Sequence, residues 1–80
     1  MAIDYSALLT NEQKRAILEQ RLTQFVSEAY QHDINKQIAV LSNNTEAIKA
    51  ADDALVVLDT AITVHQEALA ALPEVPTPIV

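Results

Sequence analysis

The side chains best suited to acid–base or metal chemistry in this chain are its two histidines, His32 and His65. Helical bundles commonly bind metals through Glu-x-x-His motifs, but Ala29 and Ile62 stand where such a motif needs glutamate. Glu28 and His32 are four residues apart and could hold a divalent ion only if a neighbouring chain supplied further ligands. A solvated pair is the commoner meaning of that spacing. We therefore predict no metal site and no cofactor.

Nucleophilic catalysis has no visible basis either. Ser6, Ser27 and Ser42 lie far from both histidines or on other faces of the expected helices. The chain contains no glycine, which excludes a Gly-rich phosphate loop and a strained nucleophile elbow. We expect a protein without catalytic residues, not an enzyme.

His65 belongs to a heptad pattern that organises the stretch 45–72. Apolar residues recur there at alternating steps of three and four, which predicts a helix packed along another helix. A polar residue in such a seam can set register or oligomer state, and a buried histidine would respond to pH. We favour the simpler alternative, a histidine near the open end of a bundle, hydrogen-bonded to a neighbour such as Gln20 or Glu19. The seam residues are Ile48, Ala51, Leu55, Leu58, Ile62, His65, Leu69 and Leu72.

Apolar residues on this helix extend well beyond the seam. One flanking column is alanine throughout, the next reads Ala50, Val57, Val64 and Ala71, and a third contains Val56. A surface helix needs an apolar stripe only a little over 100° wide. One partner helix cannot cover this circumference, so we predict that Val56, Val57 and Val64 face a further partner.

A second helix is predicted before this one. Thr10 and Gln13 form a capping-box pattern, and good helix formers continue to about residue 42. Ser42-Asn43-Asn44 then predicts a short turn, because asparagine tolerates the left-handed backbone that ends helices. The apolar stripe of this first helix is widened by Ile17 and Phe25, which we predict to face a partner. We expect one stripe of this helix to pack on the second helix, with Leu41 beside Ile48 and Leu18 beside Leu69. The stripe consists of Leu18, Leu22, Val26, Tyr30, Ile34, Ile38 and Leu41.

The predicted fold is all-α, an antiparallel two-helix hairpin with helices at about 11–42 and 45–72. A short link makes the two helices antiparallel neighbours. We expect an N-terminal arm over 1–9, the hairpin over 10–72 and an extended, proline-containing tail over 73–80. In the tail, Val75, Ile79 and Val80 are predicted to dock on a partner, with simple disorder as the alternative.

Size and charge narrow the choice of partners. Small domains are commonly stabilised by disulfides, metals or oligomerisation, and this 80-residue chain has no cysteine. A net charge of −6 argues against nucleic-acid binding. No apolar run is long enough to span a membrane. We expect a homo-oligomer or a component of a larger protein assembly, in the cytoplasm or carried in a particle such as a virion.

Three features resemble small helical proteins encoded among the structural genes of tailed bacteriophages. They are the run 8–13 (LLTNEQ), the segment 28–32 (EAYQH) and the layout of an asparagine turn followed by heptads. The resemblance implies a virion accessory or assembly role. The expected function is thus a non-enzymatic structural or assembly protein. The alternative is a regulatory binding module, antitoxin-like or chaperone-like, that sequesters a protein partner.

Overall fold

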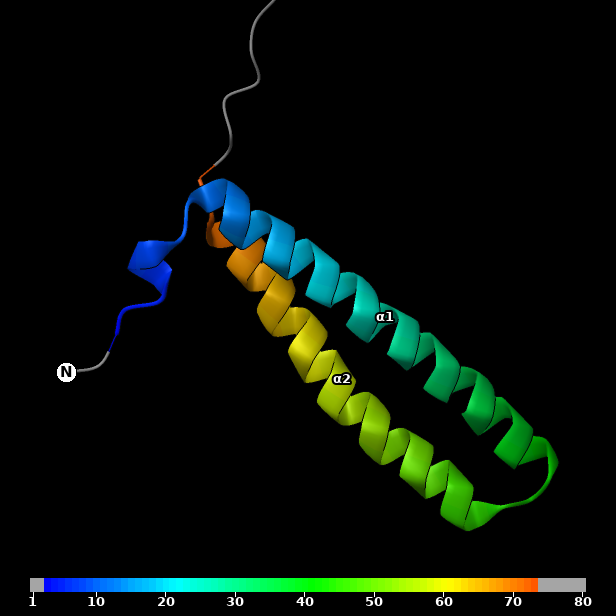
Figure 1. Ribbon diagram of the computed structural model, residues 1–80. Helices are drawn as coiled ribbons and strands as arrows, with labels where there is room; N and C mark the ends of the chain where they lie inside the picture. Colours follow the sequence, from blue (N-terminus) through cyan, green and yellow to red (C-terminus); the bar gives the residue numbers. More distant parts are fainter. Residues whose placement is uncertain (1–2, 74–80) are drawn as a thin grey trace, which may run out of the picture.

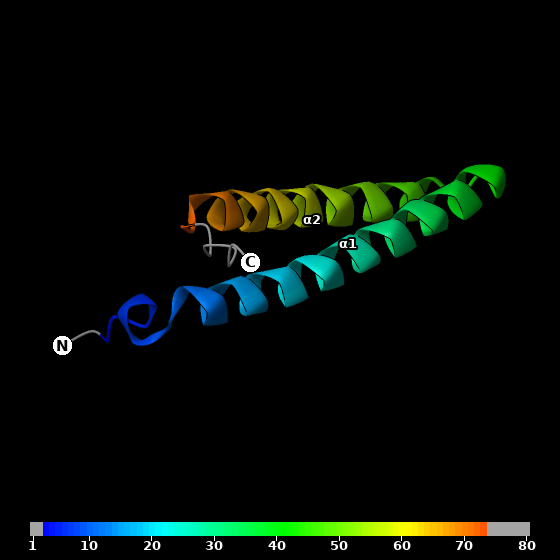
Figure 2. The ribbon, with the colours of Figure 1, turned by 90° about the horizontal axis from the view of Figure 1, so that it is seen from above.

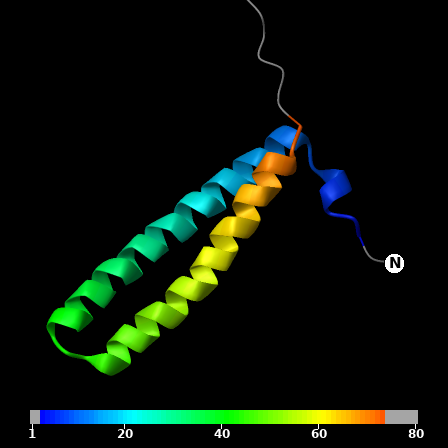
Figure 3. The same ribbon diagram turned by 180° about the vertical axis from the view of Figure 1, so that it is seen from behind.

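The computed structural model describes residues 3–73 and consists of two long helices joined by a tight turn (Figure 1). Helix α1 spans Asn11–Leu41 and helix α2 spans Thr45–Ala71, after a single 3₁₀ turn, η1, at Ser6–Leu8. The helices run in opposite directions and pack along each other, which confirms the predicted all-α hairpin (Figures 1 and 3). The helix ends lie within a residue of those predicted.

The beginning of α1 is a complete capping box. The Thr10 hydroxyl accepts a hydrogen bond from the Gln13 backbone N–H at 3.1 Å, and the Gln13 side chain accepts one from the Thr10 N–H at 2.9 Å. These bonds satisfy two of the donors that a helix start leaves open.

The turn between the helices depends on two asparagines. Asn43 adopts a left-handed backbone with φ 54°, and the N–H groups of Asn43 and Asn44 donate to the carbonyls of Val40 and Ala39. This is the Schellman arrangement that closes a helix, and asparagine takes the place of the usual glycine. The Asn44 side chain then accepts from the Ala47 N–H at 3.1 Å and caps α2. The turn therefore fixes where both helices meet.

The face of α2 that packs on α1 contains the eight heptad residues. Ala51, Leu58 and His65 are buried, and Ile48, Leu55, Ile62, Leu69 and Leu72 are half-buried.

The packed face of α1 differs from the predicted one. The residues of α1 that face α2 are buried or half-buried and also recur at alternating steps of four and three. They are Leu18, Leu22, Phe25, Ala29, His32, Lys36 and Ala39. Only Leu18 and Leu22 were predicted there. Five predicted seam residues lie on the outside, which corrects the expectation: Val26, Tyr30, Ile34, Ile38 and Leu41.

The reason for this correction is geometric. Each step of four residues advances about 40° around a helix, so a row spaced only by four leaves the contact after one or two turns. Alternating steps of three and four keep facing the partner. Phe25 contacts His65 and Lys36 contacts Asp52, so the axial alignment of the helices is close to the predicted one. What differs is the rotation of α1 about its own axis.

Introducing a negative charge by substitution should distinguish the face of α1 that packs on α2 from the face that is exposed. Ala39 is 4% exposed and Ile38 is 57% exposed. Ala39→Asp should lower the free energy of unfolding by about 2–4 kcal/mol, because the carboxylate enters the helix contact. Ile38→Asp should cost less than about 1 kcal/mol. Urea unfolding followed by circular dichroism measures both, and a larger loss for Ile38→Asp would contradict this rotation.

Candidate interaction surface

His65 is the one polar residue in the α2 seam, and it is 9% exposed. Its Nδ1 lies 2.6 Å from the Ala61 carbonyl oxygen, one turn earlier on the same helix. A carbonyl oxygen can only accept, so Nδ1 carries the proton. The Arg21 Nε–H of α1 donates to His65 Nε2 at 3.1 Å. The predicted partners Gln20 and Glu19 are not the ones used, because Arg21 lies where α1 faces the imidazole.

Phe25 completes this cluster. Its ring meets the imidazole of His65 edge-on, with centroids 5.0 Å apart and an interplanar angle of 61°. The Arg21 guanidinium carbon lies 5.6 Å from the centre of the same phenyl ring. Phe25 was predicted to face a further partner, but it is half-buried inside the hairpin. The Arg21–Phe25–His65 cluster therefore links the two helices and leaves no ring nitrogen for a ligand.

Two polar contacts tie the ends of the hairpin. Near the turn, Lys36 Nζ lies 2.7 Å from Asp52 Oδ1. The hydrogen bond and charge of Asp52 raise the pKa of Lys36 above its ordinary value. At the open end, Arg15 donates a hydrogen bond to the Pro73 carbonyl at 3.2 Å and holds the end of α2 beside the start of α1.

Among residues 3–73 there is no group of three or more metal-ligand side chains. Glu28 is exposed, whereas His32 is half-buried on the face of α1 toward α2. No described helix carries an apolar stretch long enough to cross a bilayer.

Large apolar side chains are exposed on the outer faces of both helices of this hairpin. On α1, the outward residues Val26, Tyr30, Ile34 and Ile38 form a ridge with steps of four, here called the α1 ridge. On α2, Val56, Val57 and Val64 are all more than half exposed, and Ile17 of α1 is 43% exposed. The three valines and Ile17 thus lie on the surface of the single chain, open to a partner. Val75, Ile79 and Val80 fall outside the described residues.

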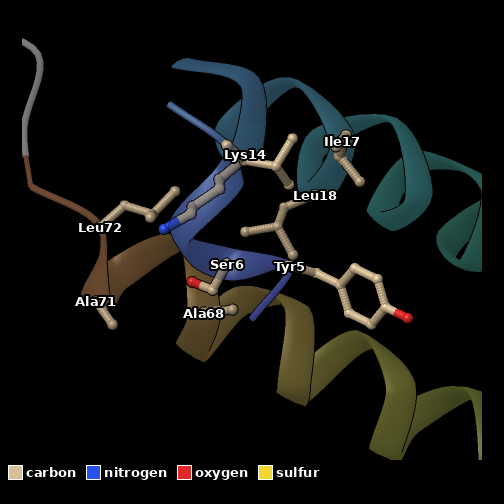
Figure 4. A pocket seen from close by; sticks show the side chains of 9 residues that line it. Tyr5, Ser6, Lys14, Ile17, Leu18, Ala68, Ala71 and Leu72 are labelled. Carbon is tan, nitrogen blue, oxygen red and sulfur yellow. The ribbon is translucent and has the colours of Figure 1, made fainter. Parts of the chain in front are cut away.

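A shallow apolar hollow of ≈ 420 Å³ lies at the open end of the hairpin (Figure 4). Its lining comes from the N-terminal arm, the first turns of α1 and the end of α2: Tyr5, Ser6, Leu9, Lys14, Ile17, Leu18, Ala68, Ala71 and the capping residue Leu72. Only the edge of the arm reaches this hollow: Ile3, Tyr5 and Leu8 remain mostly exposed, and η1 projects away from the two helices (Figures 1 and 3). Ala71 lies in the same heptad column of α2 as Val57 and Val64, so the hollow and the two valines share one side of that helix.

Sequence reasoning identified the apolar excess of α2 but missed the α1 ridge as a surface. The signal was present, because an unbroken row with steps of four is a ridge that must wind around a straight helix. Comparison with known proteins found no matching family model, no matching curated protein and no matching solved structure.

The hydrogen bonds of His65 predict one neutral tautomer, protonated at Nδ1. Long-range ¹H–¹⁵N spectra at neutral pH should show a protonated Nδ1 and a bare, hydrogen-bonded Nε2. Arg21→Leu should remove the donor to Nε2 and shift that nitrogen, while His32 serves as the internal control. A spectrum showing the Nε2–H tautomer for His65 would contradict the assigned contacts.

The contact of Lys36 with Asp52 predicts a stability change at alkaline pH. Because the pKa of Lys36 is raised in the folded chain, its contribution is complete below the pKa of an unfolded lysine and is lost as pH rises through the folded value. Thermal unfolding between about pH 9 and 12 should show a steeper loss for the natural chain than for Lys36→Met. Lys49→Met is the matched control, since Lys49 is far more exposed. If the natural chain, Lys36→Met and Lys49→Met all lost stability equally steeply with pH, the raised pKa of Lys36 in the folded chain would be refuted.

Proposed function

We propose that this chain is a non-enzymatic assembly module, a helical hairpin that completes its core by associating with other helices. The observation that carries the proposal is the lack of a sufficient core in one copy. None of the larger side chains in the described residues is fully buried, and the only buried apolar residues are Ala39, Ala51 and Leu58. Such a core is small for an independent domain.

The exposed area of the chain supports this proposal. One copy exposes 6462 Å², whereas a compact monomer of 8.8 kDa would expose roughly 4,800 Å². Exposed large apolar side chains on the outer faces of both helices contribute to this surplus. The surplus of roughly 1,700 Å² is about twice the area that one partner buries in an interface of standard size, so it leaves room for more than one such contact.

The layered shape supports it as well. Within residues 3–73 the two helices form a single layer, and they are inclined to each other so that they separate away from the turn in the view of Figure 2. A layer one helix thick has two broad faces that no other element covers. Each helix covers only a single stripe of the other. Large apolar side chains on the remaining circumference are typical of interaction surfaces.

The resemblance to small helical proteins of tailed phages fits the same function. A short, glycine-free hairpin without catalytic groups suits a structural accessory or assembly component of a particle. The second candidate is a regulatory binding module that sequesters a partner protein. Its supporting observation is the α1 ridge, which offers i±4 packing to a foreign helix.

Solution mass separates the two candidates. For the assembly module, light scattering should give a multiple of 8.8 kDa, and the melting temperature should rise with protein concentration, because folding is coupled to association. A monomer whose melting temperature does not depend on concentration would refute the self-assembling form. A labile monomer that gains helix only with a partner would favour the sequestering module.

A further inference from the structure

Helix α2 carries a second heptad strip beside the one that packs on α1. We call it the second seam, and its steps also alternate between three and four. Each member lies one residue before a member of the first seam, so the two strips face directions about 100° apart. The members next to α1 are half-buried, and those farther away are exposed. The second seam consists of Ala47, Ala50, Ala54, Val57, Ala61, Val64, Ala68 and Ala71.

We propose that the second seam binds α2 of a second copy of this chain, in antiparallel orientation. This inference rests on the proposed assembly function and names its interface. In a four-helix bundle each helix contacts two neighbours that lie in directions about 90° apart. The angle of about 100° between the two seams of α2 is close to this value. A two-fold axis perpendicular to the helices places both α1 helices on the same side of the α2 pair. Two hairpins therefore close into a four-helix bundle.

The composition of the second seam is self-complementary under such an axis. Its exposed positions read Ala50, Val57, Val64, Ala71, the same in both directions. Antiparallel pairing places Val57 opposite Val64 of the second copy and Ala50 opposite Ala71, with Ala61 beside the axis. The inner positions are all alanine, which lets two backbones approach closely. A two-fold interface requires one patch to match itself, and this patch does.

The hollow at the open end indicates the same occupant. Ala68 and Ala71 belong both to the second seam and to the lining of the hollow (Figure 4). In the antiparallel pair, the first turns of the second copy's α2, near Ala50 and Ala54, lie over this hollow. A parallel pair would bring the two hollows together and place the α1 helices on opposite sides. Only the antiparallel pair closes the bundle and covers both hollows.

Charge beside the second seam predicts how salt affects the dimer. Glu46, Asp53 and Glu67 lie in one exposed column next to it, interrupted by Thr60, and these three acids outnumber the one nearby lysine, Lys49, which is 3.6 Å from Asp53. Antiparallel pairing brings Asp53 near Glu67 of the second copy, so the two copies repel each other along this edge. Screening by salt should therefore strengthen the dimer. The apolar contact, not ion pairing, holds it together.

Cysteine cross-linking of the full chain tests the interface, since no natural cysteine interferes. In an antiparallel dimer, Val57→Cys alone cannot form a disulfide with its copy, because the two sites lie about 10 Å apart along the helices. An equimolar mixture of Val57→Cys and Val64→Cys should cross-link, and Ala61→Cys alone should cross-link across the axis. Val56→Cys is the matched control: Val56 and Val57 are 66% and 68% exposed, but Val56 lies off the second seam.

The outcomes separate this inference from the proposed function. A multimer that cross-links through Val56→Cys, or through Val57→Cys alone, would overturn the antiparallel interface and leave the assembly function standing. A strict monomer would overturn both. Cross-linking of only the mixture and of Ala61→Cys supports the inference.

A charge substitution gives an independent readout in equilibrium sedimentation. Val57→Asp should raise the dissociation constant of the dimer at least about a hundredfold, because each dimer would bury two unpaired carboxylates. Val56→Asp should change it less than about threefold, since its side chain stays in water. Raising salt from about 0.05 to 0.5 M should lower the dissociation constant of the natural chain. Equal effects of the two substitutions, or weaker association at high salt, would overturn the inference.

Discussion

Two helices lying side by side can cover only one stripe on each other, and this limit governs the whole hairpin. The α1–α2 contact is its main tertiary interface, and near the turn its most buried positions are the small residues Ala39 and Ala51, 4% and 5% exposed. Toward the open end, larger groups such as Leu58, Phe25 and His65 fill the space. Everything apolar outside this one contact remains at the surface, because a layer one helix thick has no second layer to cover it.

Polar contacts at the two ends of the hairpin help set its geometry. The Schellman turn at Asn43 and the Lys36–Asp52 ion pair define the closed end. The Arg21–Phe25–His65 cluster and the Arg15–Pro73 hydrogen bond define the open end. Exposed ion pairs contribute little stability by themselves. These contacts instead select one rotation of α1 about its axis. A rotation that buried Ile34 and Ile38 would break them.

The two outer apolar faces suit different packing geometries. The α1 ridge has steps of four, which favour a helix crossing at about −50°. The second seam of α2 has heptad steps, which favour a helix running nearly alongside at about 20°. In the proposed dimer the second seam is covered and Val26, Tyr30 and Ile34 of the α1 ridge stay outside, whereas Ile38, one residue before Ala39, lies on the side toward the second copy. The outer part of that ridge would then be free to attach the bundle to a larger assembly, a division of roles that suits a structural component.

The sequence by itself determined the local structure: both helices, the capping box at Thr10, the asparagine turn and the inward face of α2. Each depends on a few neighbouring residues or on a regular heptad repeat, so each can be read without knowing the partner. Only the tertiary structure decided the rotation of α1, which places His32 and Lys36 toward α2 and Tyr30 and Ile34 outside. It also decided that Arg21 meets His65 and that Phe25 lies inside. Apolar residues spread around much of α1, so hydrophobicity left several faces comparable. Contacts with residues of α2 that lie between 16 and 44 positions away in the chain made the choice.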